Sequence, residues 1–147
     1  VVFVHGLTGG SIKNWTRDGV CWPRDLLSDK IHHCARIMTW GYDSASYSAP
    51  DGLSLQAGTL LKGLETMRQT RVEKKRPIVF VCHSLGGIVV KQANCPGRAQ
   101  TDWIGRDENL GSIYSCTAGV IFFGTPHRSS ATATLSQIVA NIANSFS

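Results

Sequence analysis

Residues 78–90 read IVFVCHSLGGIVV, and this stretch decides the fold. The run from 77 to 82 is apolar without alternation after its proline, which is typical of a strand buried on both faces of a parallel sheet. Apolar residues resume at 88–90 after a Gly-Gly pair, which predicts a helix. A serine between such a strand and helix stands on a sharp turn at the carboxyl end of the strand, where open α/β sheets bind ligands. The pattern therefore predicts that Ser84 is a nucleophile.

The turn around Ser84 requires small side chains two positions to either side of the serine, because these positions come close together. Gly86 satisfies the requirement on the helix side, and Gly87 follows it as a second small residue that shapes the turn. Cys82 stands where a glycine is usual, and a cysteine is small enough to fit. The alternative is that Ser84 only caps the helix. We do not expect His83 to be its base, since neighbouring side chains on a sharp turn point apart.

A second glycine-rich stretch, HGLTGG at residues 5–10, directly follows a strand-like run at residues 1–4. Acyl transfer needs two N–H donors for the developing oxyanion. One comes from the residue after the nucleophile, where the helix dipole also favours negative charge, and the other from the loop after an earlier strand. We therefore expect the backbone amides of Leu85 and Leu7 to form the oxyanion hole, with Thr8 as the next choice for the second donor.

Elsewhere, short apolar runs alternate with helical stretches, which predicts an α/β fold with a mostly parallel sheet and helices on both faces. Residues 6–21, 42–54 and 96–117 read as loops. The expected strands are residues 1–4, 36–40, 77–82 and 118–123, and the expected helices are residues 23–34, 55–71, 88–94 and a last one from about 131. Two of these helices have expected buried faces, formed by Leu27, Ile31 and Cys34 and by Leu60, Leu64 and Met67. We treat residues 1–147 as a single partial domain.

The composition, with 42% hydrophobic and 17% charged residues in 147, fits one globular domain with a core. The net charge of +5 comes largely from residues 68–76, which we interpret as a solvated helix end and loop. No aromatic residues interleave these cations, which argues against nucleic acid and leaves peripheral membrane contact as an alternative. No apolar run approaches the roughly 20 residues of a membrane span. No spacing of potential ligands indicates a metal site.

The acid and the base of a serine hydrolase should follow the serine in the order Asp or Glu, then His. No carboxylate side chain follows Glu108, and the only histidine after the fourth expected strand is His127. Asp107 and His127 complete a formal set, but Asp107 precedes that strand, so His127 remains a secondary candidate for the base. Asp43 is expected to be a turn residue. We therefore expect the acid and base to lie beyond residue 147, with terminal strands missing at both ends.

Four segments resemble one known family: VFVHGL at 2–7, WGYD at 40–43, VCHSLGG at 81–87 and FFGTPHR at 122–128. They are similar to the serine esterase family that includes the serine active site-containing proteins and is related to the GPI inositol-deacylases. The form CHSLGGIVVKQA is especially like fungal members, in which this domain is often fused to others. The sequence after Ala93 departs from the family.

The resemblance implies an incomplete α/β-hydrolase core, hydrolysis of an ester or lipid substrate, and no metal or organic cofactor. It gives His127 a structural place in the floor of the site. The leading hypothesis is a serine esterase that forms an acyl-enzyme on Ser84 but is inactive as this fragment. The alternatives are a catalytically dead interaction domain and a transacylase. An intracellular location, in the cytoplasm or on an organelle membrane, is the accompanying expectation.

Overall fold

The computed structural model describes residues 1–7, 9–31, 34–43, 51–95 and 108–127, with residues 137 and 140. The strands are β1 Val2–Val4, β2 Thr16–Arg17, β3 Val20–Cys21, β4 Met38–Trp40, β5 Ile78–His83 and β6 Thr117–Phe123. The helical elements are η1 Lys13–Trp15, η2 Pro23–Leu27, α1 Ser28–Lys30, α2 Gly52–Thr66, α3 Arg71–Lys74, α4 Leu85–Ala93 and α5 Glu108–Cys116. Strands and helices alternate along much of the chain, as expected of an α/β fold.

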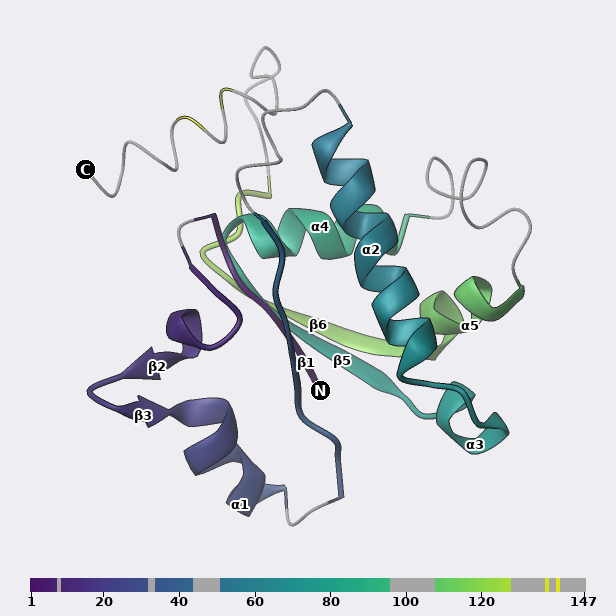
Figure 1. Cartoon of the computed structure of the whole chain (residues 1–147), viewed down its shortest axis with the longest axis horizontal. Coiled ribbons are helices and arrows are strands. Elements are labelled where there is room, and N and C mark those ends of the chain that lie inside the picture. The colour runs from purple at the N-terminus through teal and green to yellow at the C-terminus, as the bar shows by residue number, and fades with distance from the viewer. Residues whose placement is uncertain are drawn as a thin grey trace.

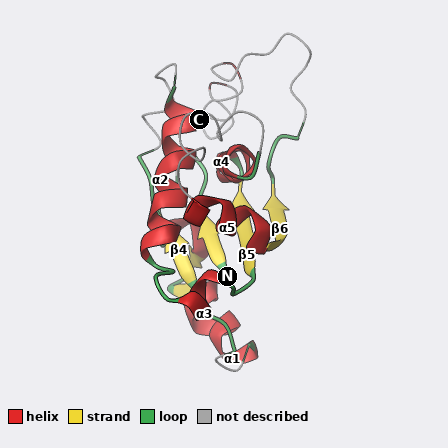
Figure 2. Ribbon diagram, turned by 90° about the vertical axis from the view of Figure 1, so that its right-hand side faces the viewer, coloured by secondary structure: helices red, strands yellow, loops and turns green. Residues whose placement is uncertain are grey.

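Four strands form one parallel sheet in the order β4-β1-β5-β6 (Figure 1). Figure 2 shows β4, β5 and β6 in one sheet, with β1 between β4 and β5. In the register of the sheet, Val4 lies opposite both Trp40 and Cys82, and His83 lies opposite Phe123. The carboxyl ends of all four strands therefore meet at one edge. The parallel α/β prediction is confirmed.

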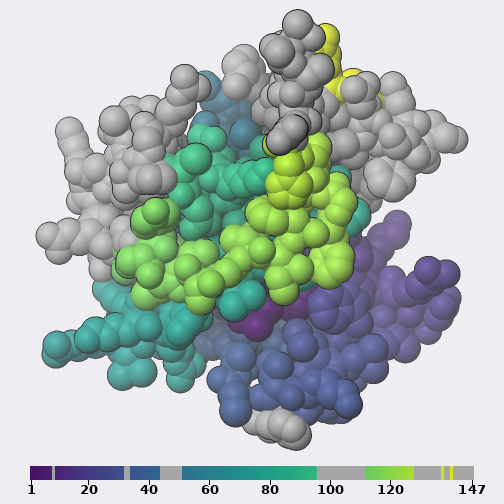
Figure 3. All heavy atoms as spheres, turned by 180° about the vertical axis from the view of Figure 1, so that it is seen from behind, coloured from purple at the N-terminus to yellow at the C-terminus, as the bar shows by residue number. Residues whose placement is uncertain are grey.

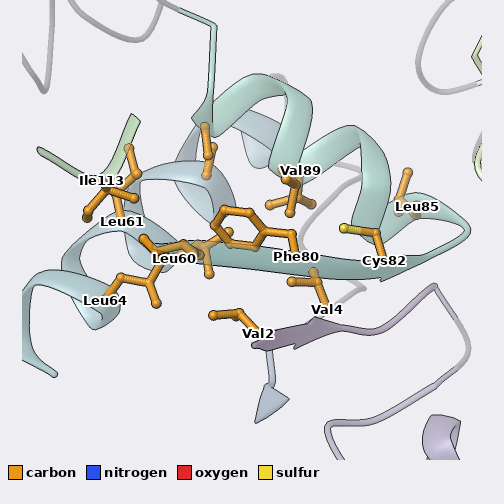
Figure 4. Packing of buried hydrophobic residues seen from close by; sticks show 14 residues of the cluster. Val2, Val4, Leu60, Leu61, Leu64, Phe80, Cys82, Leu85, Val89 and Ile113 are labelled. Atoms are coloured by element: carbon orange, nitrogen blue, oxygen red, sulfur yellow. The ribbon is translucent and has the colours of Figure 1, made fainter. Parts of the chain in front are cut away.

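Helices α2 and α4 pack on one face of the sheet and close the main core. Phe80 and Cys82, two residues apart on β5, point to this face together with Val4 (Figure 4). Leu60 of α2 and Val89 of α4 are fully buried against them. Burial of such side chains stabilises the fold by about 1.5–3 kcal/mol each. This core fixes the end of β5 and the start of α4, between which Ser84 lies.

A smaller aromatic cluster covers part of the other face. The Phe3 ring lies edge-on to Trp15 and to Trp22, with ring centroids 5.0 Å apart in both pairs, and Val81 packs beside them. The two indoles therefore serve packing. Trp15 belongs to η1, and Trp22 directly follows the β2–β3 hairpin. Both η1 and this hairpin fall within residues 6–21, which were expected only to form a loop. Short elements of two or three residues leave no periodic pattern to detect.

Strand β6 forms one edge of the sheet within the described residues, since β5 is its only partner there. Ile121 and Phe123 on this strand are 49% and 48% exposed. Figure 3 shows residues of α5 and β6, in green, spread across the surface seen from behind.

The first two expected helices end earlier in the structure than the sequence pattern predicted. Residues 23–34 were wrong as one helix, because α1 ends at Lys30 and Cys34 is exposed. The chain must leave the helix early to bring Met38 opposite Val2 on β1. Likewise α2 ends at Thr66, and Met67, expected in the core, is 51% exposed.

The expected 55–71 helix does not continue through Thr70, because this residue caps the start of a separate helix, α3. Its hydroxyl accepts from the Glu73 amide, and the Glu73 carboxylate accepts from the Thr70 amide, a capping box that begins α3. This contact and the Arg36 guanidinium lower the pKa of Glu73 to about 2. The S/T-x-x-E signal was present in the sequence and was overlooked.

Two further boundaries were wrong. Helix α4 begins at Leu85 rather than Ile88, because its two glycines lie inside the first turn. Helix α5 occupies the end of the segment 96–117, which was read as irregular; its buried Ile113 is a single apolar anchor among polar neighbours. The last expected helix, from about residue 131, lies outside the described residues apart from positions 137 and 140.

The basic stretch is not solvated throughout. Arg68 is only 7% exposed, and its Nη2 donates to the carbonyl oxygens of Lys74 and Arg76 at 3.0 and 2.7 Å. The guanidinium therefore ties the end of α2 to the turn before β5. Arg71 and Lys75 are exposed, as expected. Within the described part of the chain, no helix has both the length and the apolar character needed to cross a bilayer.

Candidate active site

Ser84 lies on the sharp turn between β5 and α4, in a strained backbone conformation. Its φ and ψ are 49° and −120°, a region that non-glycine residues rarely adopt. Its amide donates to the Phe123 carbonyl at 2.8 Å, which ties the turn to the neighbouring strand. Although Ser84 is at the N-cap position of α4, its side chain makes no capping hydrogen bond. The hydroxyl is therefore not used as a helix cap.

Gly86 is required by the backbone of β1. A Cβ placed there would lie 2.5 Å from the Val4 carbonyl oxygen and 2.4 Å from that of His5. The three nearest atoms all belong to Val4 and His5, so α4 packs so closely over the end of β1 that no side chain fits between them. The expected close approach of Gly86 to Cys82 stays a prediction.

Cys82 is fully buried in the core beneath α4. Burial raises the pKa of its thiol to about 12, so the sulfur stays protonated and is a poor nucleophile. Its role is to fill space on the sheet side of the turn, as its small size predicted.

Thr125 is a site residue that the sequence analysis missed. Its Oγ1 donates to the Ser84 carbonyl oxygen at 3.0 Å. It also explains Gly87, because a Cβ at Gly87 would lie 2.2 Å from the same Oγ1. The loop after β6 thus holds the turn from the side opposite to β1. The GTPH segment gave a signal, but the sequence alone did not single out its threonine.

The loop after β1 lies directly against the serine turn. A Cβ at Gly6 would be 3.0 Å from the Ser84 Cβ and 2.9 Å from His83 Nδ1. The Gly6 carbonyl accepts from the Gly9 amide at 3.4 Å, which closes a tight turn around Leu7. The two expected oxyanion donors, Leu7 and Leu85, therefore belong to segments that are in contact. Thr8, the next choice, lies outside the described residues.

The N–H of Leu85 is suited to donate a hydrogen bond to an oxyanion. Leu85 is the first residue of α4, so its N–H has no carbonyl partner within the helix. The positive end of the helix dipole lies at the same place. For Leu7, no backbone carbonyl of the described residues accepts its N–H. Both amides are thus available for a ligand.

His5 is a structural histidine and not a base. Its Nδ1 donates to the Gly6 carbonyl at 2.7 Å, and its Nε2 accepts from the Tyr42 amide at 3.2 Å, so the ring is neutral with both nitrogens used. The Tyr42 ring stacks on it at 4.3 Å, and the Tyr42 hydroxyl donates to the His5 carbonyl at 2.9 Å. Burial lowers the pKa of His5. Tyr42 therefore locks the His-Gly loop to β4, a role that WGYD did not reveal.

His83 Nδ1 makes no hydrogen bond to Ser84, and that His83 is not the base stays a prediction. Its ring lies edge-on to Trp15 with centroids 6.5 Å apart, beneath the Gly6 turn. Its Nδ1 is buried and has no hydrogen-bond partner among the described residues. Burial, followed by the nearby His5, lowers the pKa of His83.

His127, the secondary candidate for the base, is not brought together with Ser84. Its Nδ1 accepts a hydrogen bond from Lys91 Nζ at 2.9 Å, and its ring lies edge-on to Phe122. Asp43 is exposed after β4, in agreement with a turn residue. Asp107 lies outside the described residues. Among the residues described, no three potential metal ligands gather in one place.

We expect the folded domain to lose stability as the pH falls from about 7.5 to 5.5. The pKa values of His5 and His83 are lowered from 6.5 in the fold. As the pH falls, these histidines therefore bind protons in the unfolded chain before they do so in the folded domain. The stability present above pH 6.5 is lost as the pH falls towards the lower pKa values of the folded state. Urea unfolding at each pH, monitored through the hydrogen exchange of β1 and β5 amides, measures how the free energy of unfolding depends on pH. The variant His83→Phe should show a shallower decline, and an unchanged slope would contradict the assignment.

A strained serine between a parallel strand and a helix, facing a His-Gly loop, defines the site of an α/β-hydrolase. A sequence model of the alpha/beta hydrolase family matches residues 1–143, and the chain belongs to this family. No solved structure matches it.

Several curated relatives are similar to this chain. Protein SERAC1 of Danio rerio is 27% identical over 86% of this chain and 21% of the relative. The human protein of the same name is 24% identical over 88% of this chain and 22% of the relative, and the Bos taurus one is 26% identical over the same shares. The chain spans about a fifth of the length of these relatives.

Proposed function

We propose that this chain carries the nucleophile and the oxyanion hole of a serine esterase. The single observation behind the proposal is the backbone of Ser84, held at φ 49° and ψ −120° at the carboxyl end of β5 with its hydroxyl released from helix capping. Strain of this kind persists only where the surroundings impose it, and it is concentrated at functional sites. Here β1, β6 and α4 impose it together through Gly86, Thr125 and the Ser84 amide.

The proposed reaction passes through an acyl-enzyme. Ser84 Oγ attacks the carbonyl carbon of an ester while its proton passes to a histidine base, and the amides of Leu7 and Leu85 hold the oxyanion. Collapse breaks the bond to the leaving alcohol, which takes that proton. Water then attacks the acyl-serine and gives a proton to the same base. The base returns this proton to Ser84 Oγ as the acyl–oxygen bond breaks, which releases the carboxylic acid and restores the free serine. No cofactor enters this sequence.

We place the acid and the base beyond residue 147. Within the described residues, no hydrogen bond joins Ser84 Oγ to a histidine or carboxylate. Without a base the hydroxyl is a weak nucleophile, and an oxyanion hole with substrate binding alone supplies roughly 10³–10⁴-fold over water. Residues 1–147 by themselves are therefore expected to be inactive or nearly so.

Lipid or other acyl esters are the substrates that we propose, on the resemblance to esterases of the serine active site-containing type and to GPI inositol-deacylases. The same resemblance, in its fungal form, supports fusion to further domains. Contact with a membrane surface and an intracellular location, in the cytoplasm or on an organelle, belong to the same proposal.

Two alternatives share the fold. A catalytically dead domain used for interaction or signalling is favoured by the departure of the sequence after Ala93 and by the absence of a base at Ser84 among the described residues. A transacylase would use the same acyl-enzyme but pass the acyl group to a second alcohol in place of water.

Assays on the protein that contains this chain separate these functions. The proposal predicts turnover of p-nitrophenyl acyl esters, with free acid as the product both with and without an added acceptor alcohol. A new ester formed from the acceptor identifies a transacylase, and no turnover across acyl lengths contradicts the proposal. The isolated fragment serves as a comparison: a burst of ester hydrolysis from it, abolished by Ser84→Ala, would overturn the placement of the acid and base.

A further inference from the structure

The Gly6 turn rests on His83 as well as on Ser84. A Cβ at Gly6 would lie 2.9 Å from His83 Nδ1 and 3.3 Å from the His83 carbonyl oxygen. The imidazole thus lies immediately behind the backbone that leads to Leu7. Interiors are close-packed, so a displaced ring would leave this turn without support on that side.

Firm contacts hold the imidazole itself in place. Trp15, which is buried and packs edge-on against Phe3, also lies edge-on to the His83 ring, with centroids 6.5 Å apart. The ring therefore lies between the aromatic cluster and the Gly6 turn. No hydrogen bond of Nδ1 accounts for a histidine here, since that atom is buried without a partner among the described residues. The contacts of the His83 ring with Trp15 and the Gly6 turn therefore depend on the shape of the ring and not on its polar atoms.

We infer that His83 is a positioning residue, whose ring transmits the rigidity of the Trp15–Phe3 cluster to the Gly6 turn and so holds the Leu7 amide against Ser84. This inference rests on the proposed function for its catalytic consequence, although the mechanical support can be measured without it. His83 touches neither the substrate nor the reacting atoms in this role. It acts through the loop, as His5 and Tyr42 do from the β4 side.

The expected effect is on the transition state. Losing one oxyanion donor costs on the order of 10²–10³-fold in kcat, and a misplacement of about 1 Å costs up to roughly 10²-fold. His83→Ala should therefore lower kcat by about 10–100-fold while KM changes less than about threefold. His83→Phe, which restores a ring of similar shape without a polar atom, should retain most of the activity. His83→Asn, which is polar but short, should resemble the alanine variant.

Hydrogen exchange in the protein that contains this chain tests the support directly. In His83→Ala and His83→Asn, the amides of residues 6–9 should exchange at least about 10-fold faster than in the wild type, measured relative to the β5 amides as an internal standard. In His83→Phe they should exchange at the wild-type rate. Unchanged exchange in the alanine variant, or equal damage in the phenylalanine variant, would overturn the inference.

The kinetic arm keeps this inference apart from the esterase proposal. A wild-type protein without turnover contradicts the proposed function, while the exchange comparison still decides the role of His83. A wild-type protein with turnover, and a His83→Ala variant with unchanged kcat, leaves the esterase standing and removes His83 from its positioning role.

Discussion

Replacing Ser84 with alanine is expected to lower kcat for ester hydrolysis by on the order of 10⁴-fold or more in the protein that contains this chain. The substitution removes the oxygen that forms the acyl-enzyme, and no other group at the turn can replace it. Cys82 is buried with its pKa raised to about 12, and the buried His83 Nδ1 makes no hydrogen bond among the described residues. Initial rates with a chromogenic ester measure the effect.

Ser54, an exposed serine on α2, offers the matched control. Ser54→Ala should leave kcat and KM unchanged, because its hydroxyl lies on an exposed helix surface. Ser84→Gly adds a second comparison: it should be as inactive as Ser84→Ala yet more stable by about 1 kcal/mol, since glycine adopts a positive φ without strain. Residual turnover in both Ser84 variants near the wild-type rate would exclude Ser84 as the nucleophile.

Gly86→Ala should destabilise the domain by about 3 kcal/mol or more and abolish activity with it. The added Cβ would meet the carbonyl oxygens of Val4 and His5 at 2.5 and 2.4 Å, closer than real contacts allow. Backbone atoms cannot turn aside as a side chain can, so α4 must move away from β1. That movement separates the Leu85 amide from the loop that carries Leu7. Urea unfolding, monitored through the hydrogen exchange of β1 and β5 amides, measures the loss in the free energy of unfolding.

Gly10→Ala is the control for this substitution. Gly10 lies in the same His-Gly segment, but a Cβ there would meet no atom within 4 Å. Its φ does not lie in the positive range that alanine avoids. We expect a stability change within about 0.5 kcal/mol. Equal effects of the two substitutions would show that the contact between α4 and β1 is not what Gly86 serves.

The central part of the fold could be predicted because local signals agreed with one another. The apolar residues of β5, the Gly-Gly pair and the serine between them indicated a strand, a turn and a helix in this order, although α4 begins three residues earlier than expected. The sharp turn at Ser84 followed from this order. The strands β1 and β6 carried a similar apolar pattern, although only β1 is buried throughout.

The contacts that hold the site together could not be predicted, because they join segments far apart in the chain. Thr125 binds the Ser84 carbonyl across 41 positions, and Tyr42 locks His5 across 37. A threonine or a tyrosine in a sequence does not by itself indicate a hydrogen bond to a distant loop. The contact of Gly86 with the carbonyls of Val4 and His5 was not foreseen for the same reason. Helix α5 was missed because only Ile113 and Cys116 of its described residues pack against the main core.

Labelling with a fluorophosphonate tests the central claim most directly. The probe phosphonylates a serine oxygen only where a nucleophile and an oxyanion hole are assembled, and mass spectrometry of the digested protein locates the adduct. The account predicts that the protein containing this chain carries the adduct on Ser84, and that Ser84→Ala removes it. A folded protein that carries no adduct, or carries it on another serine, would contradict the claim that this turn holds a working nucleophile.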